Sequence, residues 1–229
     1  MEDAVTARRW LAAFVLLAAL PAAAAPFTVR LGSERIVLDS PPGFADTLEL
    51  ASPRLQDLAE TLTPASNRIL LFALSDADVR RFTNGEQLDA KRYMIAVTPK
   101  GLERERLTPA QFDLLVSDSL RHLGRSVQAA DIIKFLDQQP VGKLHLIAEL
   151  KKEPTAVSVL QAARHPELPG ATMWDDRKPQ YLFSTTTLFL VRGRALHLAV
   201  YSLFDGPADL DWLKSITQRW VDELLRLNR

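Results

Sequence analysis

The strongest constraint on the fold is a pair of long apolar segments near the C-terminus. Residues 181–191 and 195–202 are rich in β-branched and aromatic side chains, and they face each other across Arg192-Gly193-Arg194. This pattern predicts a β-hairpin. Residues 188–191 are too apolar for the edge of a sheet, so we expect them in a central strand that is covered on both faces.

The rest of the chain predicts further antiparallel strands with helices packed on them, which is an α+β fold. Thr108 and Gln111 form a capping box that opens one helix, and the last helix starts near Pro207 with Asp209 facing water. The other expected strands are residues 27–31, 35–39, 69–74, 92–98, 143–150 and 155–163, and the other expected helices are the one after Ser52-Pro53, residues 76–83 and residues 129–137.

The first 24 residues predict a secretory signal peptide. Arg8 and Arg9 precede an apolar run over residues 10–20, a proline then breaks the helix, and four alanines follow. Cleavage after Ala24 is favoured over cleavage after Ala25, because the latter places a proline first in the mature chain. Twin-arginine export and an uncleaved membrane anchor are the alternatives. We therefore expect one domain over residues 25–229, exported to the periplasm by the general secretory route.

Cysteine is absent from the chain, and its charge is balanced at 28 basic and 28 acidic residues. Without cysteine, an exported protein has no lipid anchor, disulfide, thiolate metal ligand or thiol nucleophile. The balanced charge argues against nucleic acid or anionic lipid as the main partner, and we expect no membrane association after signal cleavage. The sequence leaves the oligomeric state open.

The densest polar cluster lies in residues 165–178, which we expect to form a loop. The candidate binding residues there are Trp174, Asp175, Asp176 and Arg177. Tryptophan and arginine are enriched at binding hot spots, so this loop is a candidate recognition site. The two aspartates together with His165 offer an alternative, a divalent-ion site. A solvated turn is the third interpretation.

No other catalytic pattern stands out. The chain has no Gly-x-Ser-x-Gly motif, and its four histidines lack the spacing of a metal site. His197 lies between Ser184 and Ser202 in the expected hairpin, but a strand histidine on the more polar face is usually just half-buried. The three threonines 185–187 suit a sheet edge or a shallow groove, or they simply fill the strand. We assign no catalytic residue, metal site or cofactor.

The two ends of the chain follow an order of elements found in a known family. Residues 37–44 combine the end of a strand with a proline-rich turn and an aromatic residue, and residues 181–227 predict a long hairpin that leads into a helix across the sheet. This order resembles that of PsbP-like domains. The resemblance implies an α/β/α sandwich and a non-enzymatic accessory module of the bacterial envelope or photosynthetic lumen, and it transfers no catalytic residues. The helices expected between Ser52 and Asp137 are not part of it.

Two hypotheses for function follow. The first is an exported, non-catalytic accessory or interaction protein of the bacterial cell envelope, with another envelope protein as its partner and a groove between the sheet and residues 166–179 as its site. The second is a periplasmic hydrolase or metal-dependent enzyme built on residues 165–178. An enzyme should lose activity in Asp175→Ala or Asp176→Ala, whereas a binding module should lose its partner in Trp174→Ala.

Overall fold

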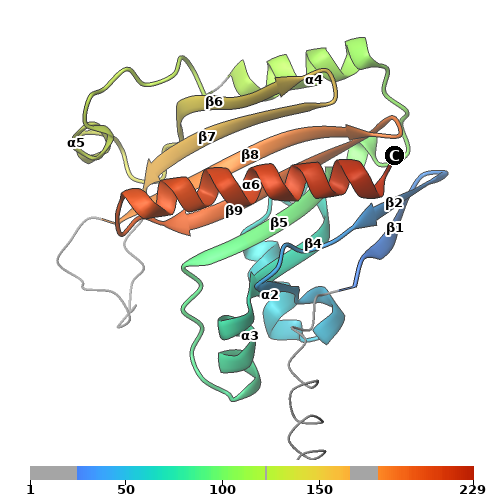
Figure 1. Cartoon of the computed structure of the whole chain (residues 1–229), viewed down its shortest axis with the longest axis horizontal. Coiled ribbons are helices and arrows are strands. Elements are labelled where there is room, and N and C mark those ends of the chain that lie inside the picture. Colours follow the sequence, from blue (N-terminus) through green and yellow to red (C-terminus); the bar gives the residue numbers. More distant parts are fainter. Residues whose placement is uncertain (1–24, 122, 166–179) are drawn as a thin grey trace, which may run out of the picture.

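A computed structural model describes residues 25–121, 123–165 and 180–229 of the protein (Figure 1). The expected signal peptide and nearly all of the expected loop over residues 165–178 lie outside these described residues. Within them, no helix is both long enough and apolar enough to cross a membrane.

A seven-stranded antiparallel sheet forms the centre of the structure. Its strand order is β3-β4-β5-β9-β8-β7-β6, so β9 is the middle strand, and a separate two-stranded sheet pairs β1 with β2. The predicted α+β fold is therefore confirmed. The strands are β1 Phe27–Leu31, β2 Glu34–Leu38, β3 Phe44–Asp46, β4 Asn67–Ser75, β5 Arg92–Pro99, β6 His145–Glu153, β7 Ala156–Arg164, β8 Tyr181–Val191 and β9 Arg194–Leu203.

Helices cover both faces of the sheet, which gives the fold three layers (Figure 1). On the front face, the buried side of α6 shares one apolar core with β5, β8 and β9. On the back face, α2 and α3 pack over β4 and β5, while α4 packs over β8. The helices are α2 Pro53–Thr61, α3 Asp76–Thr83, α4 Pro109–Arg121, α5 Ile132–Asp137 and α6 Pro207–Leu227, with two 3-10 helices, η1 Leu48–Leu50 and η2 Lys100–Leu102.

The predicted hairpin is formed by β8 and β9. Its two turn residues, Arg192 and Gly193, have φ angles of 50° and 78°, as a type I′ turn with two residues requires. Val191 pairs with Arg194, so Arg194 belongs to the strand and not to the turn. The turn is therefore one residue shorter than the predicted Arg192-Gly193-Arg194.

The most apolar part of β8 is central, as predicted. Phe189 and Val191 point to the front core, and Leu188 and Leu190 point to the cluster under α4. The strand is therefore covered on both faces, which explains why a run of apolar residues without polar alternation is stable there.

The three threonines of β8 fill the strand and do not mark a sheet edge, which corrects one of the sequence-based interpretations. Thr185 and Thr187 are fully buried on the front face, where their hydroxyl groups pair with Thr217 of α6 and Ser158 of β7. In each pair the two hydroxyl groups hydrogen-bond to each other, because neither of them can reach water. Thr186 lies half-buried on the back face.

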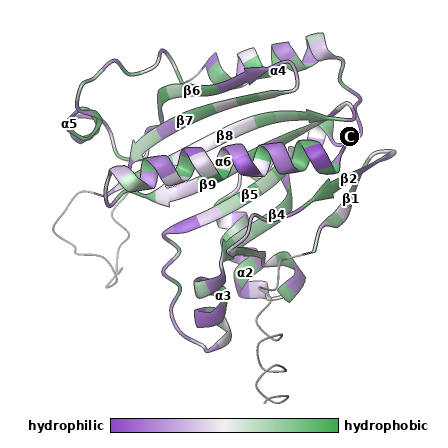
Figure 2. Ribbon diagram, in the orientation of Figure 1, coloured by the Kyte–Doolittle hydropathy of each residue, from purple (hydrophilic) through white to green (hydrophobic). Residues whose placement is uncertain are grey.

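The last helix begins at Pro207, as predicted, and Figure 2 shows hydrophobic and hydrophilic residues alternating along it. One prediction was wrong: Asp209 does not face water. Its carboxylate accepts hydrogen bonds from the backbone N–H groups of Asp205 at 2.8 Å and Gly206 at 3.0 Å, and it pairs with Arg92 at 2.7 Å. Because these donors replace water, the charge can be buried at the helix N-terminus.

The other helix starts follow the predicted signals with small differences. The capping box is confirmed: the Gln111 N–H donates to Thr108 Oγ1 at 3.3 Å, and the Thr108 N–H donates to Gln111 Oε1 at 2.8 Å. Ser52 precedes α2, but its side chain makes no capping hydrogen bond. The helix expected over residues 129–137 starts later, because Asp131 accepts the N–H of Lys134 and caps it there.

Candidate binding groove

The candidate residues from sequence, Trp174, Asp175, Asp176 and Arg177, all lie outside the described residues. His165 is described: it is half-buried, and its backbone N–H donates to the carbonyl oxygen of Gln180 at 2.7 Å. The groove expected between the sheet and residues 166–179 therefore stays a prediction. Within the described part of the chain, no three His, Asp or Glu side chains converge as metal ligands would.

The described residues bring together a different set of side chains, in the middle of the back face. Strand pairing aligns them in three rows that cross β7, β8, β9 and β5. We call these rows the back-face groove. The rows are Gln161-Ser184-Tyr201-Tyr93, Val159-Thr186-Ala199-Ile95 and Val157-Leu188-His197-Val97.

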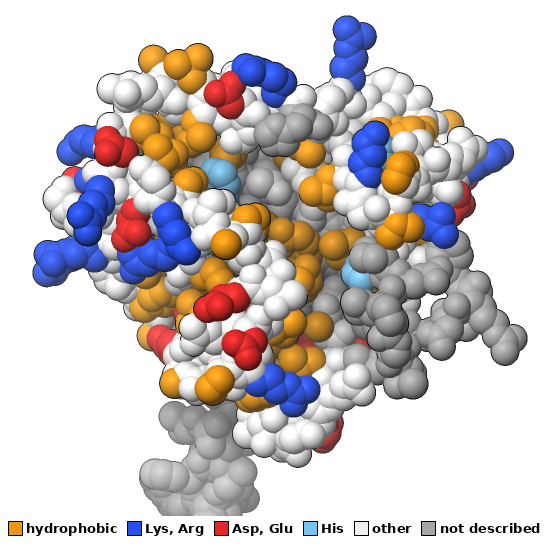
Figure 3. Space-filling model, turned by 180° about the vertical axis from the view of Figure 1, so that it is seen from behind, with side chains coloured by type: hydrophobic (Ala, Val, Ile, Leu, Met, Phe, Trp, Pro, Cys, Tyr) orange, Lys and Arg blue, Asp and Glu red, His pale blue; other side chains and the backbone are white. Residues whose placement is uncertain are grey.

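The groove lies between two helical covers. The α2–α3 cover packs over β4 and β5, and the α4 cover packs over the last part of β8, so the back of β9 is left between them. Figure 3 shows hydrophobic side chains gathered in a hollow in the middle of this face. Thr186, His197, Ala199 and Tyr201 are half-buried, although they lie on the central strands of the sheet. Centrally placed side chains that stay accessible between helices form a natural ligand site.

Two tyrosines form one end of the groove. The rings of Tyr93 and Tyr201 are stacked, with centroids 4.5 Å apart and planes 13° apart. Burial raises the pKa of Tyr93, with a smaller contribution from Tyr201, and burial also raises the pKa of Tyr201. Both phenols are therefore uncharged at neutral pH and present flat, apolar ring surfaces with hydroxyl groups at their ends.

His197 lies at the opposite end of the groove. Its Nε2 atom is buried and has no hydrogen-bond partner among the described residues. Burial lowers the pKa of His197 to about 4, so the imidazole is neutral at pH 7. A neutral imidazole carries one donor and one acceptor nitrogen, so this side chain has an unused hydrogen-bonding atom in an apolar setting.

Serine hydrolysis finds no support in this geometry. Ser202 is fully buried on the front face, and its hydroxyl donates to the carbonyl oxygen of Leu203. Ser184 shares the back face with His197, but it pairs with Tyr201, four residues farther along β9. That offset places the two roughly 13 Å apart along the strand, well beyond hydrogen-bonding distance.

The first row of the groove adds two more polar side chains. Gln161 is 6% exposed and Ser184 is 2% exposed, and neither side chain makes a hydrogen bond to another described residue. Buried polar groups are nearly always hydrogen-bonded, by protein, water or ligand. The groove therefore combines an apolar floor with several unused hydrogen-bonding groups and no ionised side chain.

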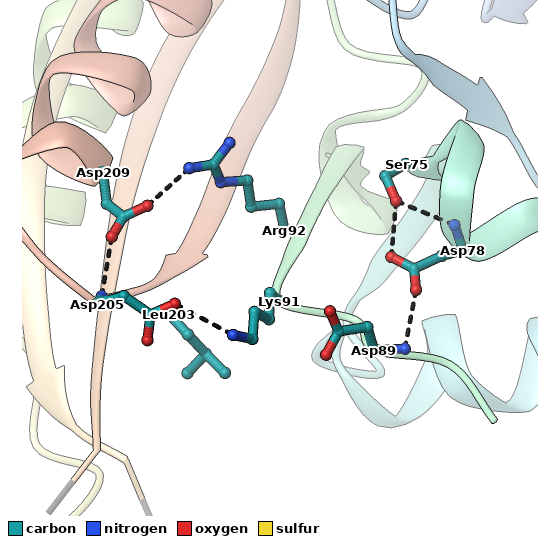
Figure 4. Close-up of a pocket in the computed structure, with 8 residues that line it drawn as sticks. All are labelled: Ser75, Asp78, Asp89, Lys91, Arg92, Leu203, Asp205 and Asp209. Carbon is teal, nitrogen blue, oxygen red and sulfur yellow. Dashed lines mark hydrogen bonds and ion pairs between the residues drawn. The ribbon is translucent and has the colours of Figure 1, made fainter. Parts of the chain in front are cut away.

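A second hollow, of about 290 Å³, lies where β5 and α6 begin (Figure 4). Its charged side chains hold each other: Arg92 pairs with Asp209, and Lys91 pairs with Asp205 at 3.1 Å. Asp78 accepts hydrogen bonds from the Ser75 hydroxyl at 2.7 Å and from the Asp89 N–H at 2.8 Å. The hydrogen bonds of these charges are used to join α3, β5 and α6, so this hollow is a structural junction.

A third hollow, of about 480 Å³, lies between Pro41-Pro42 and α6. Ile216 and Trp220 form its apolar wall, and Trp220 is fixed by a hydrogen bond from its indole N–H to the carbonyl oxygen of Asp39 at 2.7 Å. On its rim, Glu223 is paired with Arg226. Trp220 thus packs in the core, where it is 2% exposed.

Comparisons with known proteins add little. No protein-family model matches the chain, and no curated protein matches it. Among solved structures, the Saccharomyces cerevisiae Ran-binding protein Mog1p is similar over 90% of this chain and 95% of that chain, with 13% identity and a TM-score of 0.39. A mutant of the protein Mog1 is similar over 89% and 93%, with 14% identity and a TM-score of 0.37. At such TM-scores the likeness carries no argument about fold or function.

Only part of the signal needed to find the groove is present in the sequence. Alternation along residues 195–202 places His197, Ala199 and Tyr201 on one face, and the structure confirms this. Tyr93 and Gln161 were not predicted as site residues, because only strand pairing between distant segments brings them into the same row. The apolar segments that hold them predict strands but contain no signal for strand order.

Proposed function

We propose that the protein is a non-catalytic binding protein that takes up an uncharged, apolar polypeptide segment in the back-face groove. The observation that carries this proposal is the half-open centre of the sheet, where neutral ring and aliphatic surfaces surround hydrogen-bonding groups that the described residues leave unused. A charged ligand would lose its hydration there without gaining an opposite charge.

A polypeptide fits these groups better than a pure hydrocarbon does. The Nε2 atom of His197, the amide of Gln161 and the hydroxyl of Ser184 offer hydrogen bonds at both ends of the groove. Peptide N–H and C=O groups recur along an extended segment at strand spacing, and its side chains can lie on the apolar middle row. A hydrocarbon would bury these polar groups without partners.

We also propose that the protein acts outside the cytoplasm, as an accessory or interaction protein of the bacterial cell envelope. The residue pattern over positions 1–24 supports export, and the lack of cysteine fits a core-stabilised domain. A relation to PsbP-like domains is part of this proposal. It is supported by the long β8–β9 hairpin, which leads into a helix laid across the sheet.

The enzymatic alternative, a hydrolase or metal-dependent enzyme using residues 165–178, has no observation in its favour among the described residues. Its aspartates, Asp175 and Asp176, lie outside them, and His197 is not paired with a serine.

The groove is tested by titrating the protein with a blocked, uncharged peptide rich in leucine, valine and alanine. We expect the ring resonances of His197, Tyr93 and Tyr201 to shift together, and we expect Thr186→Trp to abolish these shifts because the indole fills the middle row. Leu114→Trp is the matched control, since Leu114 is 67% exposed on α4 and adds the same bulk outside the groove. Equal binding by the Thr186→Trp variant would contradict the proposal.

A further inference from the structure

Two hairpin tips meet at one corner of the molecule, away from the groove. The β1–β2 turn contains Gly32 and Ser33, and the β8–β9 turn contains Gly193, which accepts the N–H of Leu107 at 2.8 Å. The C-terminal end of the chain reaches the same corner, because Arg192 donates to the carbonyl oxygen of Asn228. Figure 1 shows both tips near the C-terminus.

Arg194 is buried in this corner without a counter-charge. It is 4% exposed, and its Nη2 atom donates to the hydroxyl of Ser33 at 3.2 Å. Its Nε and Nη1 atoms are buried and have no hydrogen-bond partner, and no carboxylate of the described residues pairs with it. A buried charge without a partner is strongly unfavourable, so an anion that meets this guanidinium group gains a large interaction.

Glycine lets the chain pack closely around these guanidinium groups. A Cβ atom on Gly32 would lie 3.0 Å from Nη2 of Arg194, and one on Gly193 would lie 2.8 Å from Cγ of Arg106. Each glycine thus allows an arginine to lie directly against a turn. The two turns thus each hold one arginine side chain at this corner of the molecule.

The surroundings of Arg194 are basic. We use the name arginine corner for Arg35, Arg106, Arg192 and Arg194. Arg192 donates to the carbonyl oxygens of Arg35 and Asn228, and no carboxylate of the described residues forms an ion pair with it. Glu34 lies 3.5 Å from Arg106, whose side chain is 72% exposed. This arrangement is complementary to an anion.

We infer that the arginine corner binds a phosphate-type oxyanion, with Arg194 as the central donor and Arg106 and Arg192 at the rim. A guanidinium group donates two parallel N–H bonds to an oxyanion, and Arg194 has two nitrogen atoms without partners. The exposed Arg106 side chain lies on the solvent side of the corner. This site is separate from the back-face groove, so it does not rest on the function proposed above.

The test uses inorganic phosphate as the probe, in a thermal-unfolding series at constant ionic strength with chloride as the balancing ion. We expect the unfolding temperature of the wild type to rise with phosphate concentration, because a ligand of the native state stabilises it. Arg194→Gln should raise the phosphate dissociation constant by about tenfold or more, which is the effect of losing charge-assisted hydrogen bonds. Arg219→Gln, on the exposed side of α6, is the matched control and should behave as the wild type does.

Arg194→Gln removes a buried side chain and can change the stability by itself. The readout is therefore the dependence of the unfolding temperature on phosphate concentration. Should that variant not fold, the exposed Arg106→Gln/Arg192→Gln double variant replaces it, with the same expected loss of affinity. No phosphate-specific rise in the wild type, or an equal rise in either variant, would overturn the inference. Flotation with phosphatidylglycerol vesicles then distinguishes a lipid headgroup from a soluble phosphate compound. Vesicle binding that depends on Arg194 assigns the oxyanion to a lipid headgroup, and no vesicle binding assigns it to a soluble phosphate compound.

Discussion

Single side chains in this protein show how burial and hydrogen bonding act against each other. His197 is the clearest case, because its imidazole is buried in the groove without a partner for Nε2. An exposed histidine would titrate near 6.5, but burial lowers the pKa of His197 to about 4. The unfolded chain therefore binds a proton in a pH range where the folded protein does not, and stability depends on pH.

Acidification should accordingly destabilise the protein through His197. Above pH 6.5, His197 does not lower the free energy of unfolding. Its destabilising effect grows as the pH falls from 6.5 to about 4, where it reaches on the order of 3 kcal/mol. His197→Phe removes it, so the variant should lose less free energy of unfolding between pH 7 and pH 4.5 than the wild type. Urea denaturation at the two pH values measures this. His145→Phe is a control with a smaller expected effect, and identical losses in wild type and His197→Phe would contradict the assignment.

The hydroxyl pair of Thr185 and Thr217 links the sheet to α6 in a site without water. Thr217→Val leaves the Thr185 hydroxyl unpaired, and we expect a loss of about 1–3 kcal/mol in the free energy of unfolding. The Thr185→Val/Thr217→Val double variant should be close to the wild type, since both polar groups are removed together. A double-mutant cycle by chemical denaturation measures this coupling, and strictly additive losses would argue against the pair.

At the scale of secondary-structure elements, the start of α6 combines three stabilising contacts on one carboxylate. Burial raises the pKa of Asp209. Its hydrogen bonds with Arg92 and with the N–H groups of Asp205 and Gly206 lower the pKa by a larger amount, so the net pKa lies below the usual range. The contribution of Asp209 to stability is therefore present at neutral pH and is lost as the pH falls below 3.8 through the lowered pKa. Arg92 also lies over the ring of Trp212, 4.2 Å from its centroid, so one contact network joins β5 to α6.

Asp209→Ala should therefore destabilise the protein by about 1–3 kcal/mol, because it removes the cap and leaves Arg92 without its partner. Asp211→Ala is the matched control, since Asp211 is exposed two residues along the same helix and should change stability by less than about 0.5 kcal/mol. Thermal unfolding of both variants tests this. Equal effects would show that the loss comes from helix propensity and not from the buried network.

Elements of this fold could be predicted where the signal is local. The capping box at Thr108 and helix α3 over Asp76–Thr83 depend on residues close in sequence and lie where predicted, and the β8–β9 turn differs from its prediction by one residue. The burial of Asp209 could not be predicted, because its partner Arg92 lies 117 residues away. The groove was missed for the same reason: its rows depend on pairing between β5, β7, β8 and β9.

At the scale of the whole molecule, three layers leave two separate sites, one apolar and uncharged, the other basic. The groove lies at the centre of the back face, and the arginine corner lies at the tips of two hairpins. We therefore expect the two proposed sites to bind their ligands independently, so a variant in one site should leave binding at the other intact.

The proposed export also concerns the whole chain, and it can be measured directly. In a bacterial host, we expect the protein in the periplasmic fraction, with a mature chain that starts at Ala25, as determined by N-terminal sequencing. Ala24→Leu should block this cleavage, because the peptidase requires small residues there. Ala13→Leu, within the apolar run, should leave cleavage unchanged. Full-length protein in the cytoplasm would contradict the proposed location.

The middle strand of the sheet has a consequence for how the chain is made. Since β9 is inserted between β5 and β8, a growing polypeptide that lacks residues 194–203 has two half-sheets, β3-β4-β5 and β8-β7-β6, with nothing to join them. Pairing of β5 with β9 also closes a long stretch of chain, which is slow. Residues 194–203 must therefore be synthesised before the sheet can close. If the protein is exported as we propose, this order of assembly would keep the chain unfolded while it crosses the membrane.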